Sequence, residues 1–404
     1  MTLAELSRKL QNGEFSAYEL TKNYLEKEDE YGAYLFKNED AISVAKEIDN
    51  RRLSGEKLHP LAGIPIAIKD NIVTKGMPTT CASRTLEGYI PPYDATVVEK
   101  IKKAGMPILG KTNMDEFGMG STGENSAFYP TKNPKDTTLV PGGSSSGSAA
   151  AVSGGLAPVA LGSDTGGSCR LPATYCGVVG FKPSYGAVSR YGLIAFASSL
   201  DQIGIIGKCA EDIGLVFDLI SGRDPRDMTS IEKKNIRIDR PRVRNICDFN
   251  DKIFKTVLYA YYIISSAEAY SNLNRYDGVY YGKCRKFGEE VQRRVELGAY
   301  VSGHENVGEY YEKASAARRA ICDKMDEIFK ECDFIVTPTV KGDVPQLGSL
   351  KNGADMYELD EFTTLANLAY LPAISLPSGI TIMGRRGEDM SLISYAREVE
   401  KNGI

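Results

Sequence analysis

Several features that define other classes of protein are scarce in this sequence of 404 residues. No apolar run approaches the length of a membrane-spanning helix, and no signal peptide is recognisable at the start. The eight cysteines are scattered and include no Cys-x-x-Cys pair, so a disulfide framework is not indicated. We therefore expect a protein of the reducing cytoplasm that makes no membrane contact.

The sequence also lacks an excess of basic residues. It has 49 Lys and Arg against 53 Asp and Glu, a formal net charge of −4. Proteins that hold nucleic acid directly usually carry a strongly cationic surface. We therefore expect no direct nucleic-acid footprint, so that any contact with RNA would come through a partner.

Histidine is nearly absent, whereas small residues are abundant between positions 141 and 170. Ser144 and Ser168 lie 24 residues apart in this stretch, and Lys69, which follows an apolar run, lies 75 residues before Ser144. A serine becomes a strong nucleophile only when a neighbouring base removes its proton. Because His59 and His304 are both distant in sequence from the serines, the composition favours a lysine as that base.

A flexible Gly/Ser linker is the alternative interpretation of this stretch. Three features favour folded structure instead. Apolar residues recur through positions 156–161, a Gly-Gly pair that permits a tight turn directly precedes Ser168, and Asp164 and Arg170 flank that turn with opposite charges.

Periodicity and capping residues predict alternating helices and strands. Capping boxes open helices after Thr2 and Ser16, residues 94–103 have a helical pattern, and residues 289–331 have helical apolar spacing. Short buried strands are expected at residues 64–68, 106–109, 159–161 and 334–336. This alternation indicates an α/β layered fold, in which chemistry is usually carried by loops at strand ends.

The serine-rich motifs resemble those of the amidase signature family. They read Gly-Gly-Ser-Ser-Ser-Gly-Ser at residues 142–148 and Gly-Ser-Asp-Thr-Gly-Gly-Ser-Cys-Arg-Leu-Pro at residues 162–172. Residues 175–204 are similar to the glutaminase subunits of tRNA-dependent amidotransferases within that family. Shorter matches follow at residues 109–117, 271–278, 290–294 and 366–373. The motifs are long and keep the family's order over most of the chain, which argues against a chance match.

The resemblance implies one amidase domain over residues 1–404, with the signature core at residues 60–210. Its expected fold is α/β, with a large mixed β-sheet core covered by helices on both faces. The resemblance also implies that Ser168 is the nucleophile, Ser144 the bridging serine and Lys69 the base of an acyl-enzyme mechanism.

Two further requirements follow from this mechanism. Backbone N–H groups of Thr165, Gly166 and Gly167, with that of Ser168, are expected to stabilise the oxyanion. Lys69 must be neutral to accept a proton, although the ordinary lysine pKa is about 10.4, so burial has to lower it. We expect the apolar side chains of Ile64, Ile66 and Ile68 to supply that burial.

In the amidotransferase-like subunits the amide donor is glutamine. Arg294 and Asp360 match the positions that would bind its α-carboxylate and α-amino groups, although a helix-surface arginine and a helix-capping aspartate are the plainer interpretations. The released ammonia would serve transamidation of glutamate on tRNA(Gln). The resemblance implies no metal or cofactor in this chain, partner subunits B and C, and ATP and Mg on a partner only.

The chain departs from the family pattern at several points. Ser146 and Tyr370 stand where glycine is usual, and Cys169 replaces a branched aliphatic residue. Residues 224–254 are short and basic where relatives carry a longer segment, and residues 378–384 compress an expected hairpin. We predict a compact variant whose assembly with partners is open. A free-standing amidase of small amides and a non-catalytic binding partner are the alternatives.

One motif points to a different function. Residues 105–112 match the P-loop pattern, which binds phosphates when it follows a strand. Here a helix precedes Gly105, Pro107 has no N–H, and residues 106–109 themselves have the pattern of a strand. We therefore expect no nucleotide at this position.

Overall fold

The computed structural model describes residues 1–404 except positions 235, 237, 239, 247–251, 351–352 and 404. Within this part, ten strands form one mixed sheet in the order β1-β3-β2-β4-β6-β5-β9-β10-β8-β7. The strands are β1 (Tyr34–Lys37), β2 (Ile66–Lys69), β3 (Ile108–Thr112), β4 (Ala160–Asp164), β5 (Val179–Lys182), β6 (Gln202–Gly207), β7 (Val243–Asn245), β8 (Phe334–Pro338), β9 (Ala373–Ser375) and β10 (Ile380–Gly384). Parallel pairing joins β2 to both β3 and β4, and β7 to β8, whereas the other neighbours are antiparallel.

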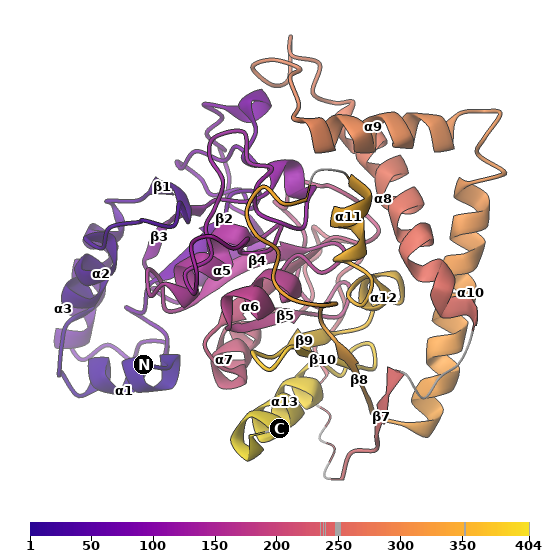
Figure 1. Ribbon diagram of the computed structural model, residues 1–404. Coiled ribbons are helices and arrows are strands. Elements are labelled where there is room, and N and C mark those ends of the chain that lie inside the picture. Colours follow the sequence, from indigo (N-terminus) through magenta and orange to yellow (C-terminus); the bar gives the residue numbers. More distant parts are fainter. Residues whose placement is uncertain (235, 237, 239, 247–251, 351–352, 404) are drawn as a thin grey trace.

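Helices cover both faces of the sheet (Figure 1). They are α1 (Leu3–Gln11), α2 (Ala17–Leu25), α3 (Ala41–Leu53), α4 (Thr96–Lys103), α5 (Ser146–Ser153), α6 (Arg170–Cys176), α7 (Ala210–Ile220), α8 (Val257–Leu273), α9 (Glu289–Ser302), α10 (Tyr311–Glu331), α11 (Gly353–Glu358), α12 (Thr364–Leu368) and α13 (Asp389–Asn402). One face packs against α1, α4, α7 and α13, and the other against α5, α6, α8, α10 and α12. The predicted fold class is confirmed.

Alternation along β2 decides which side of the sheet its residues face. Ile66 and Ile68 belong to the core under α1, α4, α7 and α13, whereas Ala67 packs with the alanines of α5 on the opposite face. Because successive side chains of a strand point to opposite faces, Lys69 leaves the sheet on the α5 side. The strand therefore delivers the lysine to the N-terminal end of α5.

Most predicted elements are present with shifted bounds. Thr2 and Ser16 each form a complete capping box at the start of α1 and α2. The helical apolar spacing over residues 289–331 is present as two helices, because Gly303 ends α9 and α10 begins at Tyr311. The compressed hairpin at the end of the chain is present as β9 and β10, joined by a short turn.

The P-loop alternative does not fit the structure. Residues 108–112 form β3, and the side chains of Lys111 and Thr112 are buried. Nζ of Lys111 lies 3.6 Å from a carboxylate oxygen of Asp70 and donates to the carbonyl of Ile72 at 2.8 Å and to the hydroxyl of Thr79 at 2.7 Å. The lysine is therefore part of the interior beside β2 and does not face a phosphate.

The basic segment after α7 contributes an edge strand to the sheet. Its short strand β7 pairs in parallel with β8, and Arg242, just before it, forms an ion pair with Asp333. No described helix is both long and apolar enough to cross a membrane. The seven cysteines in the described part of the chain are free thiols.

Candidate active site

Lys69 and the first serine meet on the α5 side of the sheet. Nζ of Lys69 lies 2.8 Å from Oγ of Ser144, 2.9 Å from Oγ of Ser145 and 3.4 Å from the carbonyl oxygen of Ser163. The lysine is fully buried, and burial lowers its pKa to about 8, although the Cys169 thiol and nearby carboxylates oppose the shift. At pH 7.4 roughly a fifth of such a lysine is neutral, against roughly 0.1% at the ordinary pKa.

The surroundings of this lysine differ from the expectation. The prediction that Ile64, Ile66 and Ile68 bury it is wrong, because all three belong to the core on the opposite face of the sheet. The side chain is instead enclosed by serine hydroxyls and a backbone carbonyl at the start of α5. Burial on this face therefore lowers the pKa of Lys69, and the three isoleucines take no part in it.

Ser168 lies on a turn directly after β4. Its side chain is 8% exposed, and its hydroxyl has no hydrogen-bond partner in the part of the chain that the structure describes. The N–H of Ser145 donates to the carbonyl of Ser168 at 3.0 Å, which ties this turn to the segment that carries Ser144. The structure thus brings the two serines and the lysine into one buried region.

The turn before Ser168 requires glycine at two positions. A Cβ at Gly166 would lie 2.4 Å from the ring of Tyr261. At Gly167, where φ is +134°, a Cβ would lie 2.3 Å from Oγ1 of Thr363. These contacts explain a Gly-Gly pair at this point, because any larger residue would displace the turn.

The N–H groups of this turn are not equivalent. That of Gly167 donates to Asp164 at 2.9 Å. Those of Thr165, Gly166 and Ser168 have no acceptor within the described residues. The N–H groups of Thr165, Gly166 and Ser168 are therefore free to bind an oxyanion, whereas that of Gly167 stabilises the turn.

A buried ion pair fixes the turn from below. Asp164 accepts bonds from Nε and Nη2 of Arg170 at 3.1 and 3.0 Å, and from the amide of Asn367 at 2.9 Å. Burial alone would raise the pKa of Asp164, but the Arg170 charge and these hydrogen bonds outweigh it and lower the pKa to about 2. The opposite charges that flank this turn in the sequence form its permanent scaffold.

A second loop braces Ser144. The Gly143–Ser144 peptide bond is cis, and a Cβ at Gly143 would lie 1.8 Å from a carboxylate oxygen of Asp115. The N–H of Asp115 donates to the carbonyl of Ser144 at 3.2 Å. Its carboxylate accepts the N–H groups of Gly123 and Asn125, so the loop folds around this aspartate.

Arg294 is buried in a ring-lined site rather than lying on the surface of α9. Its Nε donates to Glu290 at 2.6 Å, and its guanidinium carbon lies 4.3 Å from the Tyr262 ring centre and 4.6 Å from that of Tyr357. Its Nη1 is buried without a hydrogen-bond partner among the described residues. A buried unpaired guanidinium donor is costly, and a ligand carboxylate would satisfy it.

Asp360 lies close to this arginine and does not act as a helix cap through its side chain. Its carboxylate accepts the Tyr262 hydroxyl at 2.6 Å and the Ser121 hydroxyl at 2.9 and 3.0 Å. Burial raises the pKa of Asp360 to about 6, while these hydrogen bonds and the charge of Arg294 oppose the rise. The Tyr262 side chain therefore contacts both residues, with its ring under Arg294 and its hydroxyl on Asp360.

Backbone contacts connect this pair to the serines. The carbonyl of Ser121 accepts the N–H of Gly143 at 2.9 Å, while its hydroxyl binds Asp360. On the other side, the N–H of Thr363 donates to the carbonyl of Asp360, and its hydroxyl donates to the carbonyl of Gly166. The predicted catalytic and substrate-binding residues thus share one continuous network.

The sequence motifs do not identify Ser121, Ser145, Tyr262 or Thr363 as functional. Their signal is weak, because single serines, threonines and tyrosines are common and only the fold brings these four together. Tyr261 and Tyr262 lie in an apolar stretch that resembles an ordinary buried helix.

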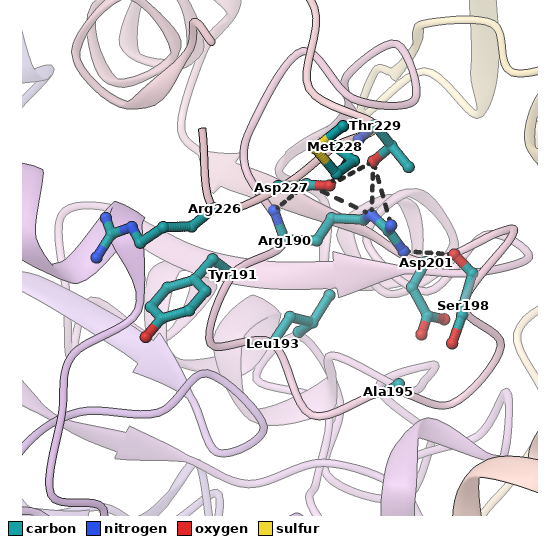
Figure 2. A pocket seen from close by; sticks show the side chains of 10 residues that line it. All are labelled: Arg190, Tyr191, Leu193, Ala195, Ser198, Asp201, Arg226, Asp227, Met228 and Thr229. Carbon is teal, nitrogen blue, oxygen red and sulfur yellow. Dashed lines mark hydrogen bonds and ion pairs between the residues drawn. The ribbon is translucent and has the colours of Figure 1, made fainter. Parts of the chain in front are cut away.

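Two hollows border the site. One hollow of about 190 Å³ is lined by Thr122, Glu290 and Met356. Thr122 follows Ser121, which binds Asp360, and Glu290 accepts a hydrogen bond from Arg294. Another of about 310 Å³ has Arg190, Ser198 and Asp201 on its wall (Figure 2). Asp201 accepts the hydroxyl of Thr165 at 2.6 Å, so one residue on the wall of this hollow contacts the Ser168 turn.

The amidase family model matches residues 19–245 and 244–392, and the chain belongs to this family. The two matched stretches meet at residues 244–245, inside the segment predicted to be shortened.

Within the family, the chain is similar to the A subunits of glutamyl-tRNA(Gln) amidotransferases. That of Chlamydia pneumoniae is 43% identical over 454 residues, covering 96% of this chain and 92% of the relative. The A subunit of Natranaerobius thermophilus is 42% identical over 467 residues, covering 99% of this chain and 95% of the relative. The corresponding protein from Thermotoga maritima is 39% identical in sequence, and its crystal structure matches with a TM-score of 0.84 over 100% of this chain and 94% of that one. The two sequence alignments are longer than the 404 residues of this chain, so the relatives carry residues that it lacks.

Proposed function

We propose that this chain is the glutaminase subunit of a tRNA-dependent amidotransferase, in which it hydrolyses glutamine to supply ammonia. The observation that carries the proposal is the contact of 2.8 Å between Nζ of Lys69 and Oγ of Ser144. It supports a lysine of lowered pKa as the base of a serine amidase, because no histidine is close to these serines in sequence.

In the proposed reaction, Oγ of Ser168 attacks the side-chain amide carbonyl of glutamine. Its proton passes through the Ser144 hydroxyl to neutral Lys69, and the free N–H groups of Thr165, Gly166 and Ser168 stabilise the oxyanion. The C–N bond then breaks, and the proton returns to the leaving nitrogen, which departs as ammonia. Water, deprotonated by the same relay, hydrolyses the acyl-enzyme to glutamate.

Glutamine is the proposed substrate because its two α-substituents match the two buried charges. The free Nη1 of Arg294 suits the α-carboxylate, and Asp360 suits the α-ammonium group. The contact between Tyr262 and both residues supports a single site for both groups.

The relatives' names support a role as one subunit of a glutamyl-tRNA(Gln) amidotransferase. We infer that ammonia passes to partner subunits B and C, which transamidate Glu-tRNA(Gln) in the cytoplasm. In this scheme ATP and Mg act on a partner, and this chain needs no cofactor of its own. A free-standing amidase is the alternative function, because the chain is shorter than relatives named as subunits.

The test is ammonia release from glutamine, asparagine and propionamide by the purified chain, alone and with the B and C subunits of its source organism. We expect glutamine to be preferred and its turnover to rise when the partners are added. Propionamide hydrolysed faster than glutamine, with or without partners, would favour the free-standing amidase. If the folded wild-type chain hydrolyses none of the three amides, alone or with partners, the non-catalytic alternative is favoured.

A further inference from the structure

Exposed apolar and aromatic side chains gather on one part of the surface. Of the fifteen large apolar or aromatic side chains that are exposed in the described part of the chain, six lie on two loops. We call these six the tyrosine surface: Tyr89, Ile90, Tyr93, Val279, Tyr280 and Tyr281. The second loop joins α8 to α9 and projects from the molecule in Figure 1, and its Tyr280 is 86% exposed.

The two loops form one continuous surface. The N–H of Lys283 donates to the carbonyl of Thr85 at 2.7 Å, and its Nζ forms an ion pair with Glu87 at 3.1 Å. A hollow of about 400 Å³ lies between the loops, lined by residues of both, including Leu86, Tyr89, Tyr276 and Tyr280. The surface therefore has a concave centre with apolar and aromatic walls.

The projecting loop is held in shape by its own hydrogen bonds. One carboxylate oxygen of Asp277 accepts the N–H groups of Val279, Tyr280 and Tyr281 at 2.9, 2.9 and 3.0 Å. The N–H of Gly278 also donates to the carbonyl of Tyr281 at 3.0 Å. Because these side chains sit on an ordered turn, binding them would cost little conformational entropy.

The rim of the surface is basic although the whole chain is acidic. Residues 84–94 and 275–286 contain five basic and three acidic side chains, against a net charge of −4 for the chain. Asp277 is occupied by N–H groups, and Glu87 is shared by Arg84 and Lys283. The basic side chains without an ion pair to any described residue are Arg275, Arg285 and Lys286.

We propose that the tyrosine surface is the docking site for an acidic segment of a partner protein, which inserts an apolar side chain into the hollow. Tyrosine and arginine are enriched among the residues that dominate protein–protein binding energy. The unpaired basic rim fits acidic residues on the partner. This inference rests on the proposed function in taking the partner to be another subunit of the amidotransferase.

The surface lies directly behind an element of the active site. Tyr276 packs against Phe117 with ring centres 5.4 Å apart. The next residue, Gly118, lies against the bridging serine, since a Cβ built on it would be 3.7 Å from Oγ of Ser144. A partner seated on the tyrosine surface therefore covers the support of Ser144, and we expect docking to change kcat as well as affinity.

Aromatic side chains beside basic ones also suit single-stranded nucleic acid. The acidic balance of the whole chain favours a protein occupant, because nucleic-acid affinity depends mainly on cationic charge. The test therefore includes RNA as a separate arm.

The experiment compares Tyr280→Asp with Tyr259→Asp, a control on α8 whose side chain is 72% exposed outside this surface. Binding of the B and C subunits of the source organism is measured by isothermal titration calorimetry. Basal propionamide hydrolysis is measured in the same preparations to show that both variants are folded. We expect Tyr280→Asp to weaken binding at least about 30-fold and the control less than about 3-fold, with basal activity unchanged in both.

A charge arm uses Arg285→Glu, which we expect to weaken binding and to reduce its salt dependence. Equal affinity of wild type and Tyr280→Asp for the partner would overturn the proposal. So would tRNA binding by the chain alone that is lost in Tyr280→Asp. A wild-type chain that hydrolyses glutamine but binds neither subunit would overturn the docking site and leave the glutaminase function standing. Binding of a partner subunit that is lost in Tyr280→Asp, by a chain that does not hydrolyse glutamine, would support the docking site and overturn the glutaminase function.

Discussion

Replacement of Asp360 by asparagine isolates the charge that is proposed to hold the α-ammonium group of glutamine. Asparagine keeps the size of the side chain and can still accept the hydroxyls of Ser121 and Tyr262. The substitution therefore removes one negative charge with little change of shape. Propionamide, which lacks the α-substituents, serves as the matched substrate because it needs only the serines and Lys69.

The expected loss follows from the surroundings of the carboxylate. Removing one partner of a buried charge pair typically costs about 2–5 kcal/mol. Two hydroxyl donors and the nearby Arg294 already neutralise part of the Asp360 charge, so we expect the lower half of that range. A loss of about 2–3 kcal/mol corresponds to roughly a 30- to 150-fold lower kcat/KM for glutamine. For propionamide we expect less than about a 3-fold change.

The pH dependence gives an independent measurement. Burial raises the pKa of Asp360 to about 6, so the carboxylate is charged above that pH and becomes neutral below it. The ratio of kcat/KM for glutamine to that for propionamide should therefore fall as pH drops through about 6 in the wild type. Because both substrates need neutral Lys69, the effect of that lysine cancels in the ratio. In Asp360→Asn the ratio should stay low and flat.

Ammonia release is followed by a coupled glutamate dehydrogenase assay between pH 5 and pH 9, with both substrates at several concentrations. Equal losses for glutamine and propionamide would refute the assignment, because they would show that Asp360 supports the fold of the site rather than reading the substrate. A ratio that still falls near pH 6 in Asp360→Asn would assign that titration to a different group.

Three further outcomes are expected. Lys69→Ala and Lys69→Arg should both lose amide hydrolysis by at least about 1,000-fold, since arginine cannot lose its proton. In the wild type, kcat should rise with pH through about 8 as Lys69 becomes neutral. Near-normal turnover by Lys69→Arg would exclude Lys69 as the base. A fluorophosphonate should label Ser168 covalently, as mass spectrometry of the tryptic peptide would show, and labelling that persists in Ser168→Ala would contradict its role. Gly166→Ala should lower kcat at least about 10-fold and lower Tm, because its Cβ would lie 2.4 Å from the Tyr261 ring; unchanged kinetics and melting would show that the turn adapts.

Local signals in the sequence are sufficient to predict much of the fold and the centre of the site. The capping boxes at Thr2 and Ser16 involve residues three apart, so the sequence contains all their parts. The short apolar run before Lys69 likewise predicts a strand that ends at the lysine, as β2 does. The long ordered motifs around the serines then identify the family.

What the sequence could not predict depends on contacts between distant segments. The sequence places Lys69 among isoleucines, because neighbours along the chain are the only neighbours that a sequence displays. The alternation of β2 sends those isoleucines to the other face, and the real neighbours come from residues 144–163. The link between Ser121 and Asp360 spans 239 residues, and no local pattern marks either end of it.

The position of Tyr262 constrains how this site could change its substrate. One side chain stacks under the cation at one end of the site and donates to the carboxylate at the other. Loss of the whole side chain, as in Tyr262→Ala, would therefore release both requirements at once and open the pocket to amides without charged groups. Loss of the hydroxyl alone, as in Tyr262→Phe, would keep the ring under Arg294 and weaken only the contact with Asp360. The two ends of an α-amino acid are thus separable at this residue in one direction only, because removing the ring also removes the donor to the carboxylate.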